Sequence, residues 1–303
     1  YQGIGISVQQ PDETGSTVAE VYDGSPAALA GMQAGDVNTS VNATSVANLS
    51  LQDMLARFTT DGTTPNVIVC LRGGKEYTFS VTSAEVHINR VVSTVYNGTI
   101  GYIRITEFNG SVSDDFAAAA KALQEQGIQN LIIDLRDNPG GGLTEVLAVA
   151  GQLVPEGQTV VTIKSKSGSE RVYKSEGTGT LDMKLVVLVN GNSASASELL
   201  TGALQDYKLA TIVGTQTFGK GIVQSFFRIS ENGGWAKMTT DAYFTPNDVC
   251  IQGVGITPDI VVELPDELKD LAVDQLDPAE DTQLQTAIGL FGQQTSAPQT
   301  ANG

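Results

Sequence analysis

The stretch from Leu185 to Gln224 reads LVVLVNGNSASASELLTGALQDYKLATIVGTQTFGKGIVQ. Its first residues, Leu185 to Val189, are apolar and rich in valine, which is typical of a buried strand. The Asn-Gly-Asn sequence at 190–192 then favours a turn, and small and apolar residues follow at helical spacing as far as Leu204. The sequence therefore predicts a strand, a sharp turn and a helix, with serines at the junction. Backbone N–H groups at a helix start have no acceptor within the helix and could stabilise a developing oxyanion.

A serine hydroxyl at this junction would need a base to act as a nucleophile. His87 is the only histidine and lies far away in sequence, so a Ser-His-Asp triad would depend wholly on it. Lys220 is the better candidate because it lies between two glycines and close to the apolar residues Phe218 and Ile222. We expect these neighbours to remove water from the ammonium group, which favours the neutral form that accepts a proton. On composition alone, a surface lysine in a glycine turn and a serine that only caps a helix remain the alternatives.

Together, the runs GNSASASELL and TFGKGIVQ resemble the carboxyl-terminal processing proteases, PDZ-containing serine peptidases with a Ser-Lys dyad. The resemblance implies that Ser195 is the nucleophile, that Lys220 is its base and that Gln224 orients the lysine. Asn192 stands where this family usually has glycine. The resemblance also implies an α/β catalytic core, with a ClpP/crotonase-like β-sheet and helices, and a small β-barrel-like PDZ domain.

A second glycine-rich stretch, RDNPGGG at 136–142, follows the apolar strand that the sequence predicts over residues 130–135. It lacks the lysine and the Ser/Thr of a nucleotide-binding loop, so we reject a phosphate site. The resemblance implies that Gly140 or Gly141 donates a backbone N–H to an oxyanion hole, together with the N–H of Ala196. The sequence leaves the choice between the two glycines open. Glycine suits this role because it lets the backbone approach a substrate closely.

Two carboxylates, Glu198 and Asp206, lie near the expected dyad in sequence. Glu198 falls in the first helical turn, where a carboxylate complements the helix dipole and can close a capping box. A carboxylate beside Lys220 would stabilise its charged form, which is the opposite of what a base needs. We therefore expect structural or supporting roles for both acids.

The first 83 residues predict a small domain of short strands with one short and one longer helix. Its string SPAALAGMQAGD resembles the PDZ domains of the same protease family. The resemblance implies that the loop Gly3-Ile4-Gly5-Ile6 offers backbone N–H groups to the terminal carboxylate of a peptide that adds to a sheet edge. It also implies a regulatory role for Arg72, in coupling this domain to the catalytic one. The polar run Val37–Val41 predicts only a weak strand.

Length and charge limit the number of domains and the classes of partner. The chain has 303 residues, of which 34 are acidic and 17 basic, giving a net charge of −17. We expect a PDZ domain over 1–83, an α/β peptidase core over 84–264, and an acidic C-terminal extension over 265–303, with a helix at 281–291 and a disordered end. The negative charge argues against nucleic acid and anionic membranes as partners.

The expected substrates are proteins with exposed, fairly apolar C-termini. Two rival hypotheses remain: a non-catalytic peptide-binding protein, and a PDZ-regulated scaffold on the same fold.

No metal or organic cofactor is expected, because one histidine and two separate cysteines make no metal site. Whether Cys70 and Cys250 form a disulfide stays open. No apolar run approaches the roughly 20 residues of a membrane-spanning helix. Because the chain opens directly in a motif, we expect that an N-terminal segment was removed or lies outside this sequence, and that the protein works outside the cytoplasm, with a membrane tether as one option. Self-association also stays open.

Overall fold

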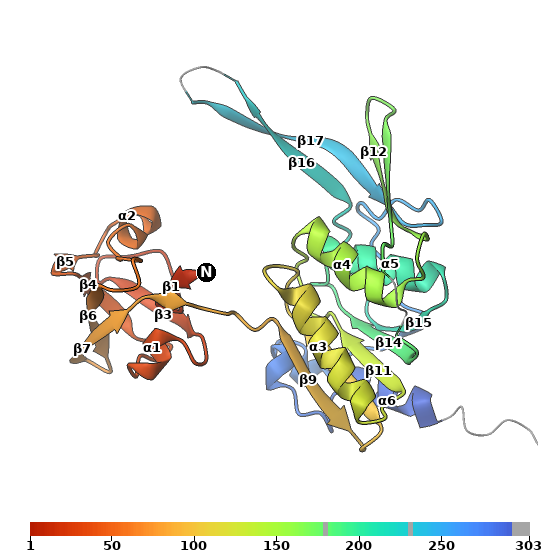
Figure 1. The fold of residues 1–303 in the computed structure, drawn as a ribbon, viewed down its shortest axis with the longest axis horizontal. Coiled ribbons are helices and arrows are strands. Elements are labelled where there is room, and N and C mark those ends of the chain that lie inside the picture. The colour runs from red at the N-terminus through yellow and green to blue at the C-terminus, as the bar shows by residue number, and fades with distance from the viewer. Residues whose placement is uncertain (178–180, 230–232, 293–303) are drawn as a thin grey trace, which may run out of the picture. The chain divides into compact units, whose positions relative to one another are not determined.

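A computed structural model describes residues 1–177, 181–229 and 233–292. The chain forms two compact units, Tyr1–Ile88 and Asn89–Gly303, so the division falls a few residues after the expected one at 83 (Figure 1). The extreme C-terminus, for which the sequence predicts disorder, lies outside the described residues. Each unit has its own hydrophobic core.

The N-terminal unit is a small sheet with two short helices. Its main sheet has the order β2-β3-β4-β6-β7, with β5 added to β4, while β1 pairs with β8. The bounds are β1 Gln2–Gly3, β2 Ile6–Val8, β3 Ser16–Val21, α1 Pro26–Leu29, β4 Val37–Val41, β5 Thr44–Ser45, α2 Leu51–Leu55, β6 Pro65–Arg72, β7 Lys75–Thr82 and β8 Ala84–Glu85. Serine caps both helices: Ser25 accepts from the N–H of Ala28, and Ser50 from that of Asp53.

The polar run 37–41 is more regular than the sequence suggests, because it forms β4 between β3 and β6. Val41 is fully buried in the core of this unit. The buried Asn38 is held by the thiol of Cys70, which donates to its Oδ1 over 3.0 Å. Cys70 and Cys250 are both free thiols. Strand pairing on both edges thus compensates for the weak local signal.

The C-terminal unit is built on a six-stranded sheet of order β18-β15-β14-β11-β10-β9, in which only β9 is antiparallel to its neighbour. These strands are β9 Val91–Tyr96, β10 Ile100–Ile105, β11 Asn130–Asp134, β14 Lys184–Val189, β15 Ala210–Gly214 and β18 Ile260–Val261. The helices of the unit are α3 Val112–Glu125, α4 Leu143–Leu153, α5 Ala196–Asp206 and α6 Thr282–Gly292. Short 3-10 turns lie at Asp266–Leu268 and Val273–Gln275. This α/β core and the small PDZ-like unit confirm the expected fold class.

Alternation along the central strands assigns the helices to the two faces of the sheet. Ile133 and Val187 point into the cluster that contains α3, α4 and α5. Ile132 and Val186, one position earlier on the same strands, point into the cluster that contains Leu284 of α6. Because both faces are covered, these strands are almost continuously apolar.

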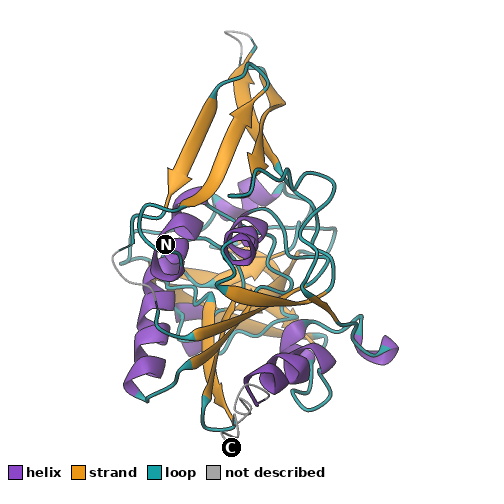
Figure 2. Cartoon of the chain, turned by 90° about the vertical axis from the view of Figure 1, so that its right-hand side faces the viewer, coloured by secondary structure: helices purple, strands orange, loops and turns teal. Residues whose placement is uncertain are grey.

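A second sheet of order β13-β12-β17-β16 projects beyond the helices and the central sheet (Figure 2), while Val160 and Val161 of β12 pack into the core cluster that contains α5. Its strands are β12 Thr159–Ser165, β13 Glu170–Lys174, β16 Ile222–Arg228 and β17 Trp235–Phe244. All its pairings are antiparallel. Neither β13 nor β16 is predicted by the sequence pattern, because none of the described side chains of these two strands is buried and no core face imposes an apolar alternation.

A buried ionic network joins the C-terminal extension to the central sheet. Arg136, only 1% exposed, pairs with Asp134 at 2.6 Å and with Asp281 at 2.8 Å. Its Nη1 also donates to Gln283 over 3.0 Å, and the phenol of Tyr102 donates to Asp134 over 2.8 Å. Burial, reinforced by the neighbouring carboxylate, raises the pKa of Tyr102. The helix expected at 281–291 is therefore tied to the core, because Asp281, just before it, and Gln283 in its first turn both bind the buried guanidinium of Arg136.

Removing one partner from this network should destabilise the C-terminal unit. We expect Asp281→Ala to lower the free energy of unfolding by about 3–5 kcal/mol, because Arg136 would lose one of its two buried carboxylate partners and the N–H groups of Gln283 and Leu284 would lose their acceptor. Chemical denaturation followed by the fluorescence of Trp235, which lies in this unit, measures the change. Glu280→Ala, at an exposed neighbouring carboxylate, is the control and should stay within about 0.5 kcal/mol of wild type. Equal stability of the two variants would contradict the structural role of Asp281.

Candidate active site

Three loops gather at one edge of the central sheet. They leave the carboxyl ends of β11, β14 and β15, which are parallel neighbours, and they span residues 135–142, 190–195 and 215–221. In open α/β sheets, ligands bind outside the carboxyl ends of the strands. The candidate site residues of the catalytic core lie on these loops or directly after them, with the exception of Asp206 at the end of α5.

Ser195 lies at the tip of the strand–turn–helix segment that the sequence predicts. Its backbone has φ 56° and ψ −114°, a conformation that residues other than glycine rarely adopt. The residue caps α5, which begins at Ala196. The N–H of Ser195 donates to the carboxylate of Glu198 over 2.8 Å, while its carbonyl accepts from Glu198 and Leu199. The cap thus engages the backbone of Ser195, and its hydroxyl makes no hydrogen bond to any described residue.

The glycine-rich loop lies directly against this turn. A Cβ placed on Gly140 would be 2.8 Å from the Cβ of Ser195 and 2.9 Å from the nitrogen of Ala196. No side chain fits at that distance, so glycine is required there. The structure therefore brings together Ser195, Ala196 and the RDNPGGG loop, which are 53 or more residues apart in sequence.

The hydrogen bonds of the glycine-rich loop distinguish between Gly140 and Gly141 as candidate oxyanion donors. The N–H of Gly140 donates to Oδ1 of Asn138 over 2.9 Å, so it is already used. The N–H of Gly142 donates to the carbonyl of Phe108 over 2.7 Å. Within the described part of the chain, the N–H groups of Gly141 and Ala196 have no acceptor, and Gly141 is exposed. Of the two glycines, Gly141 is the one whose N–H is available to a ligand.

Glu198 connects the serine turn to the lysine loop. Its buried carboxylate accepts four hydrogen bonds: from Ser195 N and Lys220 N at Oε2, both 2.8 Å, and from Thr217 Oγ1 and Gly219 N at Oε1, at 2.6 and 2.7 Å. The backbones of Ser195 and Lys220 are therefore bound to the same oxygen atom. Sequence reasoning gave Glu198 a supporting or capping role but did not identify its bonds to the lysine loop, which begins 19 residues later.

The side chain of Lys220 is exposed, so the expectation that its neighbours bury it is wrong for this structure. The glycines beside it explain the difference. Added Cβ atoms on Gly219 and Gly221 would meet the backbone of residues 252–255, so the loop packs through its glycines and leaves the lysine in solvent. Phe218, expected to shield it, is itself 64% exposed. The apolar residues near Lys220 in sequence therefore do not enclose it.

The remaining candidates of the core lie at some distance from the serine turn along the chain. Gln224 is an exposed residue of β16 and pairs with Thr239 across the hairpin. Asp206 ends α5, where its carboxylate accepts from the N–H of Asn247 over 2.7 Å, a purely structural contact. His87 is exposed and belongs to the N-terminal unit.

Asn138 and Ser193 are structural residues of the site that sequence reasoning missed. The carbonyl of Asn138 accepts from the N–H of Ala194 at 3.0 Å and from the hydroxyl of Ser197 at 2.9 Å. The hydroxyl of Ser193 donates to the carbonyl of Leu135 over 2.7 Å. A polar residue next to a Pro-Gly turn was the available signal for Asn138, but its partners lie in a distant segment. These contacts fix the glycine loop to the serine turn.

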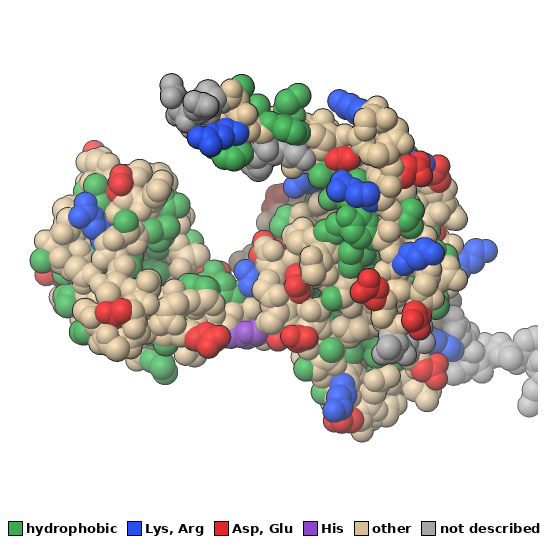
Figure 3. Space-filling view, turned by 45° about the horizontal axis from the view of Figure 1, so that its top comes forward, with side chains coloured by type: hydrophobic (Ala, Val, Ile, Leu, Met, Phe, Trp, Pro, Cys, Tyr) green, Lys and Arg blue, Asp and Glu red, His purple; other side chains and the backbone are tan. Residues whose placement is uncertain are grey.

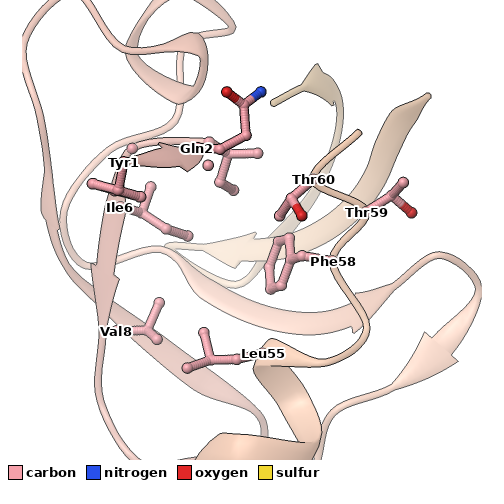
Figure 4. A pocket seen from close by; sticks show the side chains of 11 residues that line it. Tyr1, Gln2, Ile6, Val8, Leu55, Phe58, Thr59 and Thr60 are labelled. Carbon is pink, nitrogen blue, oxygen red and sulfur yellow. The ribbon is translucent and has the colours of Figure 1, made fainter. Parts of the chain in front are cut away.

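The N-terminal unit has an apolar groove between β2 and α2, with a volume of about 210 Å³. The predicted loop Gly3-Ile4-Gly5-Ile6 lines it, together with Tyr1, Gln2, Val8, Leu55, Phe58, Thr59 and Thr60. Figure 4 shows side chains of β2 and of the end of α2 turned toward this shared space. Strand β2 is an edge strand of its sheet, so a peptide strand could pair with its open side. Gly5 has φ 83°, and a Cβ there would clash with Ser25.

Arg72 makes its contacts inside the N-terminal unit. Its guanidinium binds Asp36 at 2.6 and 2.8 Å and the carbonyl of Gly31 at 2.9 Å, and it lies 4.9 Å from the centre of the Tyr77 ring. Although burial opposes it, the hydrogen bond to Arg72 leaves the pKa of Asp36 below its usual value. These contacts stabilise the unit, and a regulatory role for Arg72 stays a prediction.

Neither the surface charge nor the spacing of possible metal ligands indicates a second functional site among the described residues. On the face shown in Figure 3, acidic and basic side chains are interspersed, without a broad basic patch. The described ranges hold no group of three or more His, Cys, Asp or Glu residues placed to bind a metal ion. They also contain no helix with the length and apolarity needed to cross a bilayer.

Glu198 gives a direct test of how the site is assembled. We expect Glu198→Ala to reduce any Ser195-dependent reaction at least a hundredfold, because four donors lose their acceptor and the lysine loop loses its link to the serine turn. The rate of reaction of Ser195 with a fluorophosphonate, together with the melting temperature, measures the change. Glu125→Ala, at an exposed position on α3, is the control. A Glu198→Ala variant that reacts as fast as wild type would show that the carboxylate does not organise the site.

Comparison with known families matches both units. The model of "Peptidase family S41" matches residues 99–262, and the model of "PDZ domain" matches residues 17–72. The first match contains all three loops of the site. The second contains β3 to β6 and α2, one wall of the apolar groove.

Curated relatives match along most of the chain. A carboxy-terminal-processing protease of Bartonella bacilliformis is 35% identical over 272 residues, which are 88% of this chain and 62% of the relative. A carboxyl-terminal-processing protease of Synechocystis sp. is 36% identical over 270 residues, 87% of this chain and 63% of the relative. The chain thus spans less than two thirds of the length of these relatives.

Solved structures also match most of the chain. A photosystem II D1 C-terminal processing protease is 32% identical, with a TM-score of 0.54, over 87% of this chain and 74% of that one. An S41 protease of Bacteroides fragilis has a TM-score of 0.58 at 17% identity, over 98% of this chain and 84% of that one, and supports the fold alone. The resemblance to the carboxyl-terminal processing proteases noted from the sequence is confirmed.

Proposed function

Because the chain belongs to peptidase family S41, we propose that it is a serine endopeptidase that cleaves proteins near their C-termini with Ser195 as nucleophile and Lys220 as base. The observation that carries the proposal is the shared carboxylate oxygen of Glu198, which accepts from the backbone N–H of both residues at 2.8 Å. Two segments 25 positions apart in sequence are thereby held side by side. Such an arrangement suits a nucleophile and its base, which must lie within hydrogen-bond reach of each other.

The proposed reaction is an acyl transfer. Neutral Lys220 takes the proton of the Ser195 hydroxyl, and the alkoxide oxygen bonds to the scissile carbonyl carbon. The resulting oxyanion is stabilised by the N–H groups of Ala196 and Gly141, the pair that lacks an acceptor. Lys220 then returns the proton to the leaving amine, and water hydrolyses the acyl-enzyme by the reverse sequence of steps.

Because Lys220 is exposed in the free protein, the bound substrate is proposed to help prepare it for catalysis. Water around the exposed amine competes with the Ser195 hydroxyl for its hydrogen bonds, so the free site is poorly prepared for catalysis. A substrate chain laid over the site would displace this water and leave the amine facing the hydroxyl. Gln224, two positions into β16, is proposed to orient the lysine once the site is covered.

The apolar groove of the N-terminal unit is proposed to bind the substrate's C-terminus. The N–H groups of the Gly3–Ile6 loop would receive the terminal carboxylate, and the apolar wall made by Ile6, Val8 and Leu55 would receive its last side chain. Regulation through Arg72, an extracytoplasmic location and self-association belong to the same proposal and rest on the family resemblance.

Substitution of the dyad tests the catalytic proposal. Ser195→Ala and Lys220→Ala should each abolish cleavage of an unfolded protein such as casein, a loss of at least about a thousandfold. Lys208→Ala, at an exposed lysine beyond α5, should cleave as wild type does. Gel analysis and mass spectrometry of the products give rate and cleavage position.

Three other outcomes have clear meanings. Cleavage that survives in Ser195→Ala would refute the serine mechanism. If the wild type cleaves nothing but binds a C-terminal peptide, the chain is a peptide-binding protein on a peptidase fold. A loss of activity in His87→Ala equal to that in Lys220→Ala would restore the Ser-His-Asp alternative.

A charge placed in the groove tests substrate recognition. We expect Leu55→Glu to raise KM about tenfold, roughly 1.4 kcal/mol of binding, for a substrate with an apolar C-terminus, since a carboxylate would repel the terminal carboxylate. Leu29→Glu is the matched control, because Leu29 is 82% exposed on α1 and lies outside the groove. Amidation of the substrate C-terminus should remove the difference between the two variants. Equal KM values with the free carboxylate would exclude the groove as the recognition site.

A further inference from the structure

The proposed oxyanion hole takes its two donors from different loops, so something must fix the distance between them. Gly141 belongs to the loop after β11, and Ala196 belongs to the turn after β14. Deep in the unit, Asn138 and Ser193 already join the bases of these loops. A second connection lies at the surface and is made of side chains that the proposed mechanism does not use.

This surface connection consists of Asp137, Asn190 and Asn192, which we call the amide clasp. Oδ1 of Asp137 accepts from the side-chain amides of Asn190 at 2.8 Å and Asn192 at 2.9 Å. In return, the N–H of Asp137 donates to Oδ1 of Asn190 over 3.0 Å. Three hydrogen bonds thus join residue 137 of the glycine loop to the serine turn.

Asp137 adopts a backbone conformation that is unfavourable for a residue with a side chain. Its φ of 59° lies in the left-handed region, which costs a residue with a Cβ roughly 1–2 kcal/mol and which glycine would adopt freely. Although burial alone would raise the pKa of Asp137, the amides of Asn192 and Asn190 leave it below its usual value. The carboxylate is therefore ionised near neutral pH and remains a strong acceptor for both amides.

Asn192 is the part of the clasp that is particular to this chain. The family resemblance places glycine at this position, and a glycine has no amide to donate to Asp137. Its side chain is exposed and its only described partner is Asp137. A surface asparagine in a turn needs no such bond for its own conformation.

We propose that the amide clasp positions the oxyanion hole, by fixing the N–H of Gly141 relative to the N–H of Ala196. Asp137, Asn190 and Asn192 are then positioning residues for the peptidase reaction, which rests on the proposed function. Oxyanion stabilisation depends on donors aligned to within a fraction of an ångström, and loosening one loop should affect the transition state more than substrate binding.

A double-substitution cycle tests the clasp. Asp137→Gly and Asn192→Gly should each lower kcat about tenfold while KM changes less than about twofold. The double variant should be no slower than the slower single variant, because both substitutions break the same connection. Asn97→Gly is the matched control, since Asn97 is an exposed turn residue with φ 52° in the same unit, and it should keep wild-type kcat.

The rate of labelling of Ser195 by a fluorophosphonate gives a second readout, which needs no peptide turnover. This reaction also develops negative charge on an oxygen in the oxyanion hole, so it should slow in the clasp variants but still reach one label per chain. The proposal is overturned if kcat and labelling rate equal those of Asn97→Gly, or if the two single effects multiply in the double variant. Failure of the proposed function itself is distinct, because then wild type would show no cleavage that Ser195→Ala abolishes.

Discussion

The assembly of the candidate site depends on one buried carboxylate. Glu198 takes four hydrogen bonds, from the serine turn on one side and from the Thr217–Lys220 loop on the other. An acceptor with two oxygens can satisfy that many donors, and each donor would be costly to leave unpaired in a site without water. The first turn of α5 adds a favourable field for the negative charge. Without this residue, the loop that carries Lys220 would be connected to the serine turn mainly through the bond from Phe218 to Ser193.

The sheet explains why these loops can meet at all. Parallel strands β11, β14 and β15 end at one edge, so segments far apart in sequence emerge side by side. The glycine loop then approaches Ser195 so closely that no side chain fits at Gly140. Asp281, the residue before α6, pairs with the buried Arg136, the first residue of the RDNPGGG stretch. The same loop is thus supported from the core through Arg136 and from the surface through Asp137.

Much of this could be predicted from the sequence because its signals are local. The apolar run 185–189, the small residues after it and the glycines at 140–142 encode strand, helix and close approach within a few residues each. The helix expected at 281–291 is present as Thr282–Gly292. Strands β13 and β16 could not be predicted, because none of their described side chains is buried and no core face imposes an alternating pattern on them.

The sequence by itself determined the fold class, the family, and the residue types that the site would use. Only the tertiary structure decided how those residues are connected. It distinguished Gly141 from Gly140, because Asn138 occupies one of the two N–H groups. It left Lys220 in solvent despite apolar neighbours in sequence, because its flanking glycines pack against another segment. The physical reason is the same in both cases: hydrogen bonding and solvent exposure depend on which distant segments come into contact, and local sequence does not specify them.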